Sequence, residues 1–250
     1  MQITLNNVLK MYKDRDAGKK ALENYKYLFP IKSSETLAGI VGDLFGDGHL
    51  QGPTKWRIDF TSASIKELRR FEKEFSKIFK VKGKIRACKT NKFGTTFNYG
   101  INCKPISRIL FLCGVPAGNK VLQPFKIPKW IFGNKNYFRR FVQRLFDCEG
   151  SATVSTRTIE IQMYKDQKLF NNGLKFFLGI KRGLNNYYDI HTTNPFTQKK
   201  VNTRKDGIKT KAIRLKIRRL ESVVKFAKYI NFETASKRKN LQDIVAKIHF

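Results

Sequence analysis

The sequence predicts an α+β protein built from two similar half-domains, each an antiparallel sheet with helices packed on one face. A series of helix, strands, helix, strands and helix occurs twice along the 250 residues, and a repeat of this size indicates a duplicated unit. The expected strands alternate apolar and polar residues, as in sheets with one buried and one exposed face. The expected divisions are an N-terminal helical extension over 1–33, a first half-domain over 34–134 and a second over 135–250.

The first half-domain is expected to begin with a helix that ends in an acidic turn. Ser33 or Ser34 can cap this helix. It runs through the apolar stretch 37–45 to a Gly-Asp-Gly turn at 46–48, where glycine permits the change of direction. Another helix is expected near 14–28. The later elements of this half are a strand over 56–61, a helix over about 64–80, strands near 81–88 and 95–102, and a short helix near 105–113.

The same order restarts in the second half. A helix around 135–148 leads into Asp147-Cys148-Glu149-Gly150, so the acids Asp47 and Glu149 end two helices 149 − 47 = 102 residues apart. The later elements are a strand over 158–164, a helix from 166 to about 178, strands near 184–191 and 210–217, a helix over 219–230 and a final helix.

The charge of the chain points to a polyanionic partner. It has 51 Lys and Arg against 19 Asp and Glu, a formal net charge of +32. Nucleic acid is the first candidate, because each neutralised phosphate releases condensed counterions, and an anionic membrane surface is the second. No apolar run approaches the roughly 20 residues that span a bilayer, and the N-terminus lacks the apolar core of a signal peptide. We therefore expect an intracellular protein without a membrane partner.

The polar faces of the expected strands supply candidate contacts to DNA. Arg, Asn, Gln and Glu side chains can pair with base edges, and a twisted antiparallel ribbon fits the major groove. An ordinary solvated sheet face is the alternative, and the charge excess favours DNA. The candidates are Arg57, Asp59, Thr61, Arg86 and Asn98 in the first half and Thr158, Glu160, Gln162, Arg214 and Lys216 in the second.

The two acidic helix ends are candidates for metal binding. If the helices pack side by side, Asp47 and Glu149 meet, and Gly39, Gly42 and Gly46 give the first helix a smooth face for close approach. Two adjacent carboxylates repel unless a cation lies between them, and Mg²⁺ prefers oxygen ligands and suits phosphodiester hydrolysis. An acid beside glycine at a helix end is also ordinary turn chemistry, so the spacing alone leaves both interpretations open.

The two helix ends resemble the paired motifs of the LAGLIDADG homing endonucleases. They are Ile40-Val41-Gly42-Asp43-Leu44-Phe45-Gly46-Asp47-Gly48 and Val142-Gln143-Arg144-Leu145-Phe146-Asp147-Cys148-Glu149-Gly150, and the likeness covers about residues 34–245. The resemblance implies a monomer of two αββαββα half-domains whose saddle-shaped sheets bind double-stranded DNA, with no obligate protein partner. It also implies an intron-encoded enzyme that makes a Mg²⁺-dependent double-strand cut across the minor groove of a long asymmetric site, leaving short 3′ overhangs.

The resemblance assigns the metal chemistry to four positions. Asp47 and Glu149 match the family's catalytic acids, which also bind the metal, and the backbone carbonyls of Gly46 and Cys148 match its further metal ligands. The implied cofactor is Mg²⁺, with Mn²⁺ or Ca²⁺ able to occupy the same site.

Basic residues near the cleavage site are also implied by the family. Lys120 and Lys237 match the places of lysines that orient water and support the transition state, and Lys239 competes with Lys237 for this role. One position departs from the family pattern: Arg144 stands where many members carry glycine, which brings the close approach of the motif helices into question.

Two rival functions are weighed against the nuclease. An RNA maturase that assists group I or archaeal intron splicing uses the same fold and would bind intron RNA, whereas a DNA-binding regulator built on a decayed copy would have lost at least one acid. Because both Asp47 and Glu149 are present, the nuclease is favoured. Inteins also carry this domain, but the chain shows neither a terminal His-Asn nor a leading Cys or Ser. The compartment, an archaeal cytoplasm or an organelle matrix, stays open.

Overall fold

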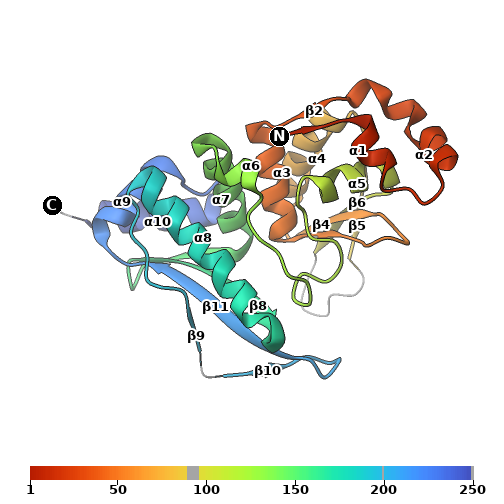
Figure 1. Cartoon of the computed structure of the whole chain (residues 1–250). Helices are drawn as coiled ribbons and strands as arrows, with labels where there is room; N and C mark the ends of the chain where they lie inside the picture. Colours follow the sequence, from red (N-terminus) through yellow and green to blue (C-terminus); the bar gives the residue numbers. More distant parts are fainter. Residues whose placement is uncertain (89–95, 199, 249–250) are drawn as a thin grey trace. The chain divides into compact units, whose positions relative to one another are not determined.

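The computed structural model describes residues 1–88, 96–198 and 200–248, and the chain folds into two compact units, Met1–Gly118 and Asn119–Phe250 (Figure 1). Each unit contains an antiparallel sheet with helices on one face, as the sequence predicts. Within the described residues, no helix combines the length and the apolar character required to cross a bilayer.

The first unit opens with a small helical extension. Strand β1 (Gln2–Ile3) pairs with β2 (Ile31–Lys32), and between them lie α1 (Leu5–Leu9), α2 (Arg15–Leu22) and the 3₁₀ helix η1 (Glu23–Leu28). The guanidinium of Arg108 lies 3.9 Å from the ring centre of Tyr12 and 4.8 Å from that of Trp56. This cation–π contact joins the extension to the rest of the first unit.

The sheet of the first unit follows the motif helix. Helix α3 (Glu35–Phe45) begins at Ser34, whose hydroxyl accepts from the Leu37 amide at 3.2 Å, and every residue from Leu37 to Phe45 is buried. The sheet order is β3-β4-β6-β5. The elements are β3 (Gly48–Leu50), β4 (Ile58–Ser62), α4 (Ile65–Phe79), β5 (Lys84–Ala87), β6 (Phe97–Ile101) and α5 (Lys104–Leu112). The strand predicted over 95–102 forms as β6. Residue 95, where the prediction begins, lies outside the described residues.

The apolar stripe of α4 forms the core beneath this sheet. Leu68, Phe71, Phe75 and Phe79 are fully buried, and the rings of Phe71 and Phe60 stack with centres 4.6 Å apart. Since α4 covers the face that carries Phe60, the side chains that alternate with it point to the other face of the sheet.

The second unit repeats the order with additions. Its sheet runs β10-β11-β8-β7, and β9 also pairs with β11. The elements are α6 (Lys129–Phe132), α7 (Lys135–Glu149), β7 (Gly150–Thr153), β8 (Thr158–Asp166), η2 (Gln167–Leu169), α8 (Phe170–Tyr188), β9 (Phe196–Thr197), β10 (Asn202–Thr203), β11 (Lys209–Ile217), α9 (Leu220–Tyr229) and α10 (Ala235–Ala246). Helix α8 lies across the sheet formed by β8 and β11 (Figure 1). The duplication is therefore present in the fold, with β9 and α10 added to the second copy.

One predicted element is wrong. The sequence predicts a strand over 184–191, but α8 continues to Tyr188. Phe177, Ile180, Leu184 and Tyr188 are buried at helical spacing, so the core-facing stripe of the helix continues past residue 178, the predicted end of this helix.

The division between the units also differs from the expected boundary at 134, because residues 119–134 contact the second sheet. The Lys165 ammonium donates to the backbone carbonyls of Lys120 and Gln123, and the Phe125 amide donates to the Asn172 side chain at 3.0 Å. These bonds attach the connecting segment to β8 and α8.

Lys165 is a buried cation on the helix-covered face of β8. Its side chain is 1% exposed, its ammonium lies 3.6 Å from the centre of the Phe125 ring, and Lys211 is its direct partner across β11. Burial is the main cause that lowers the pKa of Lys165 to about 7, and the positive charge of Lys120 adds to it.

This pKa shift predicts how stability depends on pH. The unfolded amine keeps a pKa of about 10.5, so between about pH 7 and 10 the unfolded chain binds more protons than the folded one. The contribution of Lys165 to the free energy of unfolding therefore rises with pH across this window and is lowest below pH 7. In urea titrations, the stability difference between wild type and Lys165→Met should rise from pH 7 to 10. A flat curve for Lys165→Met would contradict the assignment.

Candidate active site

Each unit places one acid where its motif helix passes into its sheet. Asp47 is exposed in the turn after α3, immediately before β3, and Glu149 is the half-buried last residue of α7, immediately before β7. The structure thus places the two acids predicted from the sequence at equivalent junctions of two repeated units.

A glycine after each acid makes this junction possible. A Cβ on Gly48 would lie 2.7 Å from the Cα of Leu44, and a Cβ on Gly150 would lie 2.6 Å from the carbonyl oxygen of Phe146. In both units the strand therefore begins in contact with the helix backbone four residues earlier, a distance that no larger residue permits. The acid is fixed between these two elements.

Lys237 lies against the acidic end of α7. Its ammonium donates to the carbonyl of Asp147 at 2.5 Å and lies 3.4 Å from that of Cys148, while Lys239, the competing lysine, is exposed. A cation at a helix C-terminus is stabilised by the unpaired carbonyls and the helix dipole. The lysine that contacts the residues just before Glu149 is therefore Lys237.

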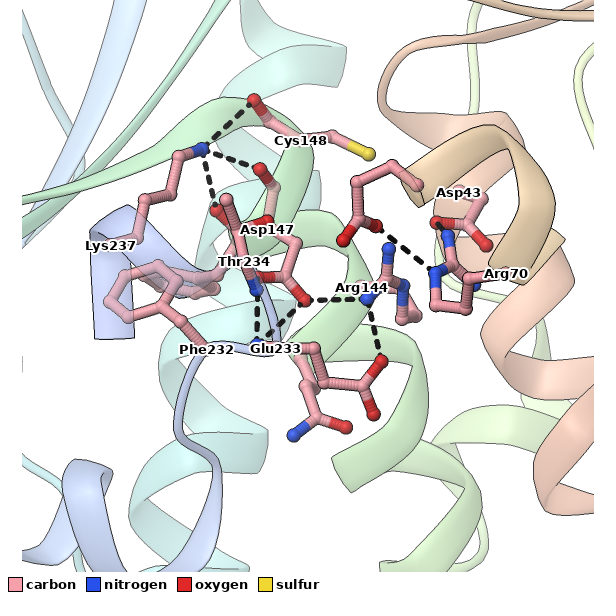
Figure 2. A network of polar contacts seen from close by, with 12 residues as sticks. Asp43, Arg70, Arg144, Asp147, Cys148, Phe232, Glu233, Thr234 and Lys237 are labelled. Carbon is pink, nitrogen blue, oxygen red and sulfur yellow. Dashed lines mark hydrogen bonds and ion pairs between the residues drawn. The ribbon is translucent and has the colours of Figure 1, made fainter. Parts of the chain in front are cut away.

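The position of Lys237 depends on a buried carboxylate. Helix α10 begins at Ala235, after Thr234, whose side chain forms no capping bond, and the Asp147 carboxylate accepts from the amides of Glu233 and Thr234, each at 3.0 Å (Figure 2). These two amides precede the helix, so the carboxylate anchors the segment that leads into α10. Asp147 therefore holds the first turn of α10, which carries Lys237, beside the end of α7.

Arg144 completes this network. Its guanidinium is 1% exposed and lies 2.8 Å from both the Asp147 and the Glu233 carboxylates, and Arg140 also pairs with Glu233. Figure 2 shows Arg144 directed to both acids. Arg144, which stands where many family members carry glycine, thus joins α7 to the segment before α10 within the second unit.

The first unit uses a different ionic contact on its motif helix. Asp43 is fully buried, and its carboxylate lies 2.9 Å from the guanidinium of Arg70, which also pairs with Glu67 and Glu74 on α4. Phe45 occupies the motif position that corresponds to Asp147. The two halves therefore fix their motif helices by unrelated side chains.

The predicted contact residues of the first sheet lie on its helix-free face. The Arg57 guanidinium lies 2.8 Å from the Asp59 carboxylate, the Asn98 amide donates to the Thr61 hydroxyl at 3.2 Å, and Arg86 is opposite Asn98 across the strands.

Sequence reasoning missed neighbours of these residues on the same sheet. Lys82 and Lys84 line a cavity of about 190 Å³ together with Arg57 and Arg86, and Gln51 donates to Asp59 at 2.9 Å. The signal for the lysines is present in the sequence, because Lys82, Lys84 and Arg86 recur at every second position.

The second sheet pairs its cations in the same manner. Arg214 and Lys216 lie 3.2 and 2.7 Å from the Glu160 carboxylate, and Gln162 is opposite Arg214. Thr158 lies on the same face of β8, since residues of one parity share a face. The candidate contacts of each half thus lie together on one exposed sheet face.

The donor atoms at the two junctions are of the type that Mg²⁺ binds. Each unit presents one carboxylate, on Asp47 or Glu149, beside a backbone carbonyl, on Gly46 or Cys148. No group of three or more His, Cys, Asp and Glu side chains gathers anywhere in residues 1–88, 96–198 and 200–248. Mg²⁺ commonly keeps several waters and uses only one or two carboxylates plus substrate phosphates, so a sparse set of oxygen donors fits this ion.

Comparison with known proteins relates the chain to homing endonucleases by fold. No family model matches. The structure superposes on the homing endonuclease I-WcaI, solved bound to its DNA recognition sequence, with a TM-score of 0.51 and 10% identity over 96% of this chain and 98% of that one. It also superposes on full-length DUF199/WhiA from Thermatoga maritima, with a TM-score of 0.52 and 16% identity over 89% and 65% of the two chains. The chain folds like a LAGLIDADG homing endonuclease.

Two relatives match in sequence over short parts of their length. The chain is 31% identical over 163 residues to the replication factor C small subunit of Methanocaldococcus jannaschii, which covers 60% of this chain and 9% of that protein. It is 26% identical over 245 residues to the tRNA-splicing ligase RtcB of Pyrococcus abyssi, covering 91% of this chain and 26% of the ligase. The chain therefore spans about a quarter or less of these relatives.

The junction glycines predict a local loss of stability on substitution. Gly48→Ala should lower the free energy of unfolding by about 1–3 kcal/mol, because the new Cβ meets the Leu44 backbone and forces the strand away from the helix. The control Gly52→Ala, whose Cβ meets nothing within 4 Å, should be neutral or stabilising by less than about 1 kcal/mol. Chemical denaturation measures both, and equal effects would refute the close approach.

The buried Asp147 carboxylate predicts a second effect on stability. Asp147→Asn removes one of the two carboxylates that pair with the buried Arg144, so we expect a loss of about 2 kcal/mol in the free energy of unfolding, with faster hydrogen exchange of the Thr234 amide. The exposed pair of Asp206 and Arg204 supplies the control, because Asp206→Asn should leave the free energy of unfolding nearly unchanged. An Asp147→Asn protein as stable as wild type would show that these bonds of Asp147 are dispensable.

Proposed function

We propose that the chain is a site-specific endonuclease that makes a metal-dependent double-strand cut in a long asymmetric DNA site. The observation that carries this proposal is the repeated junction, at which Asp47 and Glu149 each stand between a motif helix and a sheet whose other face is polar and basic. Two acids in one chain supply one carboxylate for each DNA strand, so we propose that a single copy acts as a monomer.

The sheet faces suit recognition of a duplex. Arg57, Arg214 and Lys216 are half-buried and paired with acids, so their positions are set before DNA arrives. Side chains held in place can discriminate between base edges, and the excess of positive charge over the whole chain supplies affinity for phosphates. This division of roles favours a specific target over uniform binding.

The chemistry that we propose uses a divalent cation, with Mg²⁺ as the expected ion and Mn²⁺ or Ca²⁺ as possible occupants. In each unit the acid and the carbonyl before it, Asp47 with Gly46 and Glu149 with Cys148, would help to hold an ion, which when bound activates water and offsets charge on the phosphate. Lys237 would orient water or stabilise the developing charge beside Glu149, and Lys120 would do so for the first half. The contact of Lys237 with the α7 carbonyls supports this role, because it holds the ammonium against the two residues that precede the second acid.

The sequence relatives support a mobile coding context. The parts that match this chain form 9% of a replication factor subunit and 26% of a tRNA-splicing ligase. The names of these two proteins describe unrelated functions. Such a distribution is expected of an element that copies itself into host genes by cutting DNA at a chosen site. The matched segments are translated parts of those two proteins, so our proposal of an intron as the context of this chain rests on the resemblance of its motifs alone.

The acids predict a separation of cleavage from binding. Asp47→Asn and Glu149→Gln should each lower cleavage by about a hundredfold or more, because each removes a charged metal ligand, while duplex affinity stays within about threefold. The target would first be found by treating a randomised DNA library with and without a chelator and sequencing the cut ends.

Three results would count against the nuclease. These are a wild-type protein that cuts nothing with Mg²⁺, cleavage that persists in chelator, and loss of DNA binding as large as the loss of cleavage in the acid variants. The control Asp206→Asn, an exposed acid on the loop between β10 and β11, should cut at the wild-type rate.

A further inference from the structure

The first part of the connecting segment is held on the second sheet through its own backbone carbonyls. The Lys165 ammonium donates to the carbonyls of Lys120 and Gln123. The Asp166 amide donates to the carbonyl of Val121 at 3.1 Å. Two adjacent residues of β8 therefore hold the backbone at and just after Lys120, the basic residue that we assign to the first half.

The side chain of Lys165 depends on this segment in return. Lys165 is 1% exposed, and its ammonium lies 3.6 Å from the centre of the Phe125 ring. A buried cation is stable only where nearby groups replace its water shell. Here two carbonyl oxygens and one aromatic face do so, and all three belong to the connecting segment. The cation and the segment thus stabilise each other.

The backbone on the other side of Lys120 is also fixed. Within the first unit, the Gly118 amide donates to the carbonyl of Leu50 at 2.7 Å. Next along the chain, the Asn119 side chain accepts from the Val121 amide at 3.1 Å. Lys120 therefore follows an anchored residue of the first unit by two positions and is itself anchored in the second unit.

The two lysines also interact through their charges. Burial is the main cause that lowers the pKa of Lys165, and the positive charge of Lys120 is the next. A Coulomb interaction is mutual, so the Lys165 ammonium acts on Lys120 as well as on its backbone. Loss of Lys165 would change both the support of Lys120 and the field around it.

We propose that Lys165 is a positioning residue for Lys120 in the cleavage of one DNA strand. The inference rests on the proposed nuclease. Lys165 itself lies on the helix-covered face of β8, where a Cβ on Gly173 of α8 would lie 2.9 Å from its Cγ. It therefore acts through Lys120, and a displacement of about 1 Å can slow a reaction by about a hundredfold. Lys237 is held by the α7 carbonyls instead, so the other strand should be spared.

The test follows the two strands separately, in a target duplex with a different fluorophore on each strand. Under single-turnover conditions, Lys120→Met identifies the strand that depends on Lys120. Lys165→Met should slow the same strand by about tenfold or more, while the other strand and the duplex affinity change less than about threefold. The double variant should cut no more slowly than Lys120→Met alone, because Lys165 has no other route to the reaction.

The matched control is Lys211→Met. Lys211 is the direct partner of Lys165 across β11, and its ammonium lies 5.9 Å from the centre of the Phe170 ring on α8. Its replacement removes a charge beside Lys165 and leaves the bonds to the connecting segment in place, so both strands should be cut at the wild-type rate.

A milder variant gives the same test without loss of the buried amine. Phe125→Leu removes the ring beside the Lys165 ammonium and keeps an apolar side chain in its place. It should slow the same strand as Lys120→Met, by a smaller factor than Lys165→Met. This variant decides the question if Lys165→Met does not fold, which circular dichroism checks.

Four results would overturn the inference while the protein still cuts DNA. These are equal slowing of both strands, a loss that multiplies with that of Lys120→Met, wild-type rates in Lys165→Met, and wild-type rates in Lys120→Met. A wild-type protein that cuts nothing with Mg²⁺ would overturn the nuclease and this inference together, so failure of the inference alone is distinguishable from failure of the proposed function.

Discussion

The close contact between each motif helix and the strand that follows it is the constraint on which the rest of each unit depends. A Cβ at Gly48 or Gly150 would lie 2.6–2.7 Å from backbone atoms of the preceding helix, so the chain turns from helix to sheet within a single step. The residue before each glycine is therefore held at the edge of the sheet. Because this residue is an acid in both units, one geometric requirement fixes both carboxylates.

The duplicated fold has diverged in how each unit secures its motif helix. In the first unit, Asp43 reaches the neighbouring helix α4 through Arg70. In the second, Arg144 and Asp147 reach the residues that precede α10. The second arrangement also orients a lysine toward the carbonyls beside Glu149. Equivalent backbone positions thus carry different polar networks, and the second unit gains a positioned cation from a helix that has no counterpart among the described residues of the first repeat.

Local pattern is sufficient to predict the repeat, the helix ends and the sheet faces, because each is encoded within a few neighbouring residues. The bonds that Asp147 accepts from the Glu233 and Thr234 amides are not predictable in this way, since the partners are 86 and 87 positions away and depend on the tertiary fold. The predicted strand over 184–191 is wrong because the buried stripe of α8 outweighs local strand propensity. The burial of Lys165 does have a signal in the sequence: it shares a face with Ile159, Ile161 and Met163, where a lysine must be buried.

The second unit distributes its positive charge in two ways that have different physical consequences. On the sheet face, Arg214 and Lys216 are already paired with Glu160. A ligand must compete with that acid, so it gains binding free energy only where its own groups fit better. On the α8 face, Lys175 and Arg182 are exposed and without an acid partner among the described residues, so most polyanions gain there. Pre-paired cations favour selectivity, because a poor fit leaves a separated ion pair uncompensated. Uncompensated cations favour affinity. A protein that must choose one duplex sequence is therefore expected to do so on its sheets.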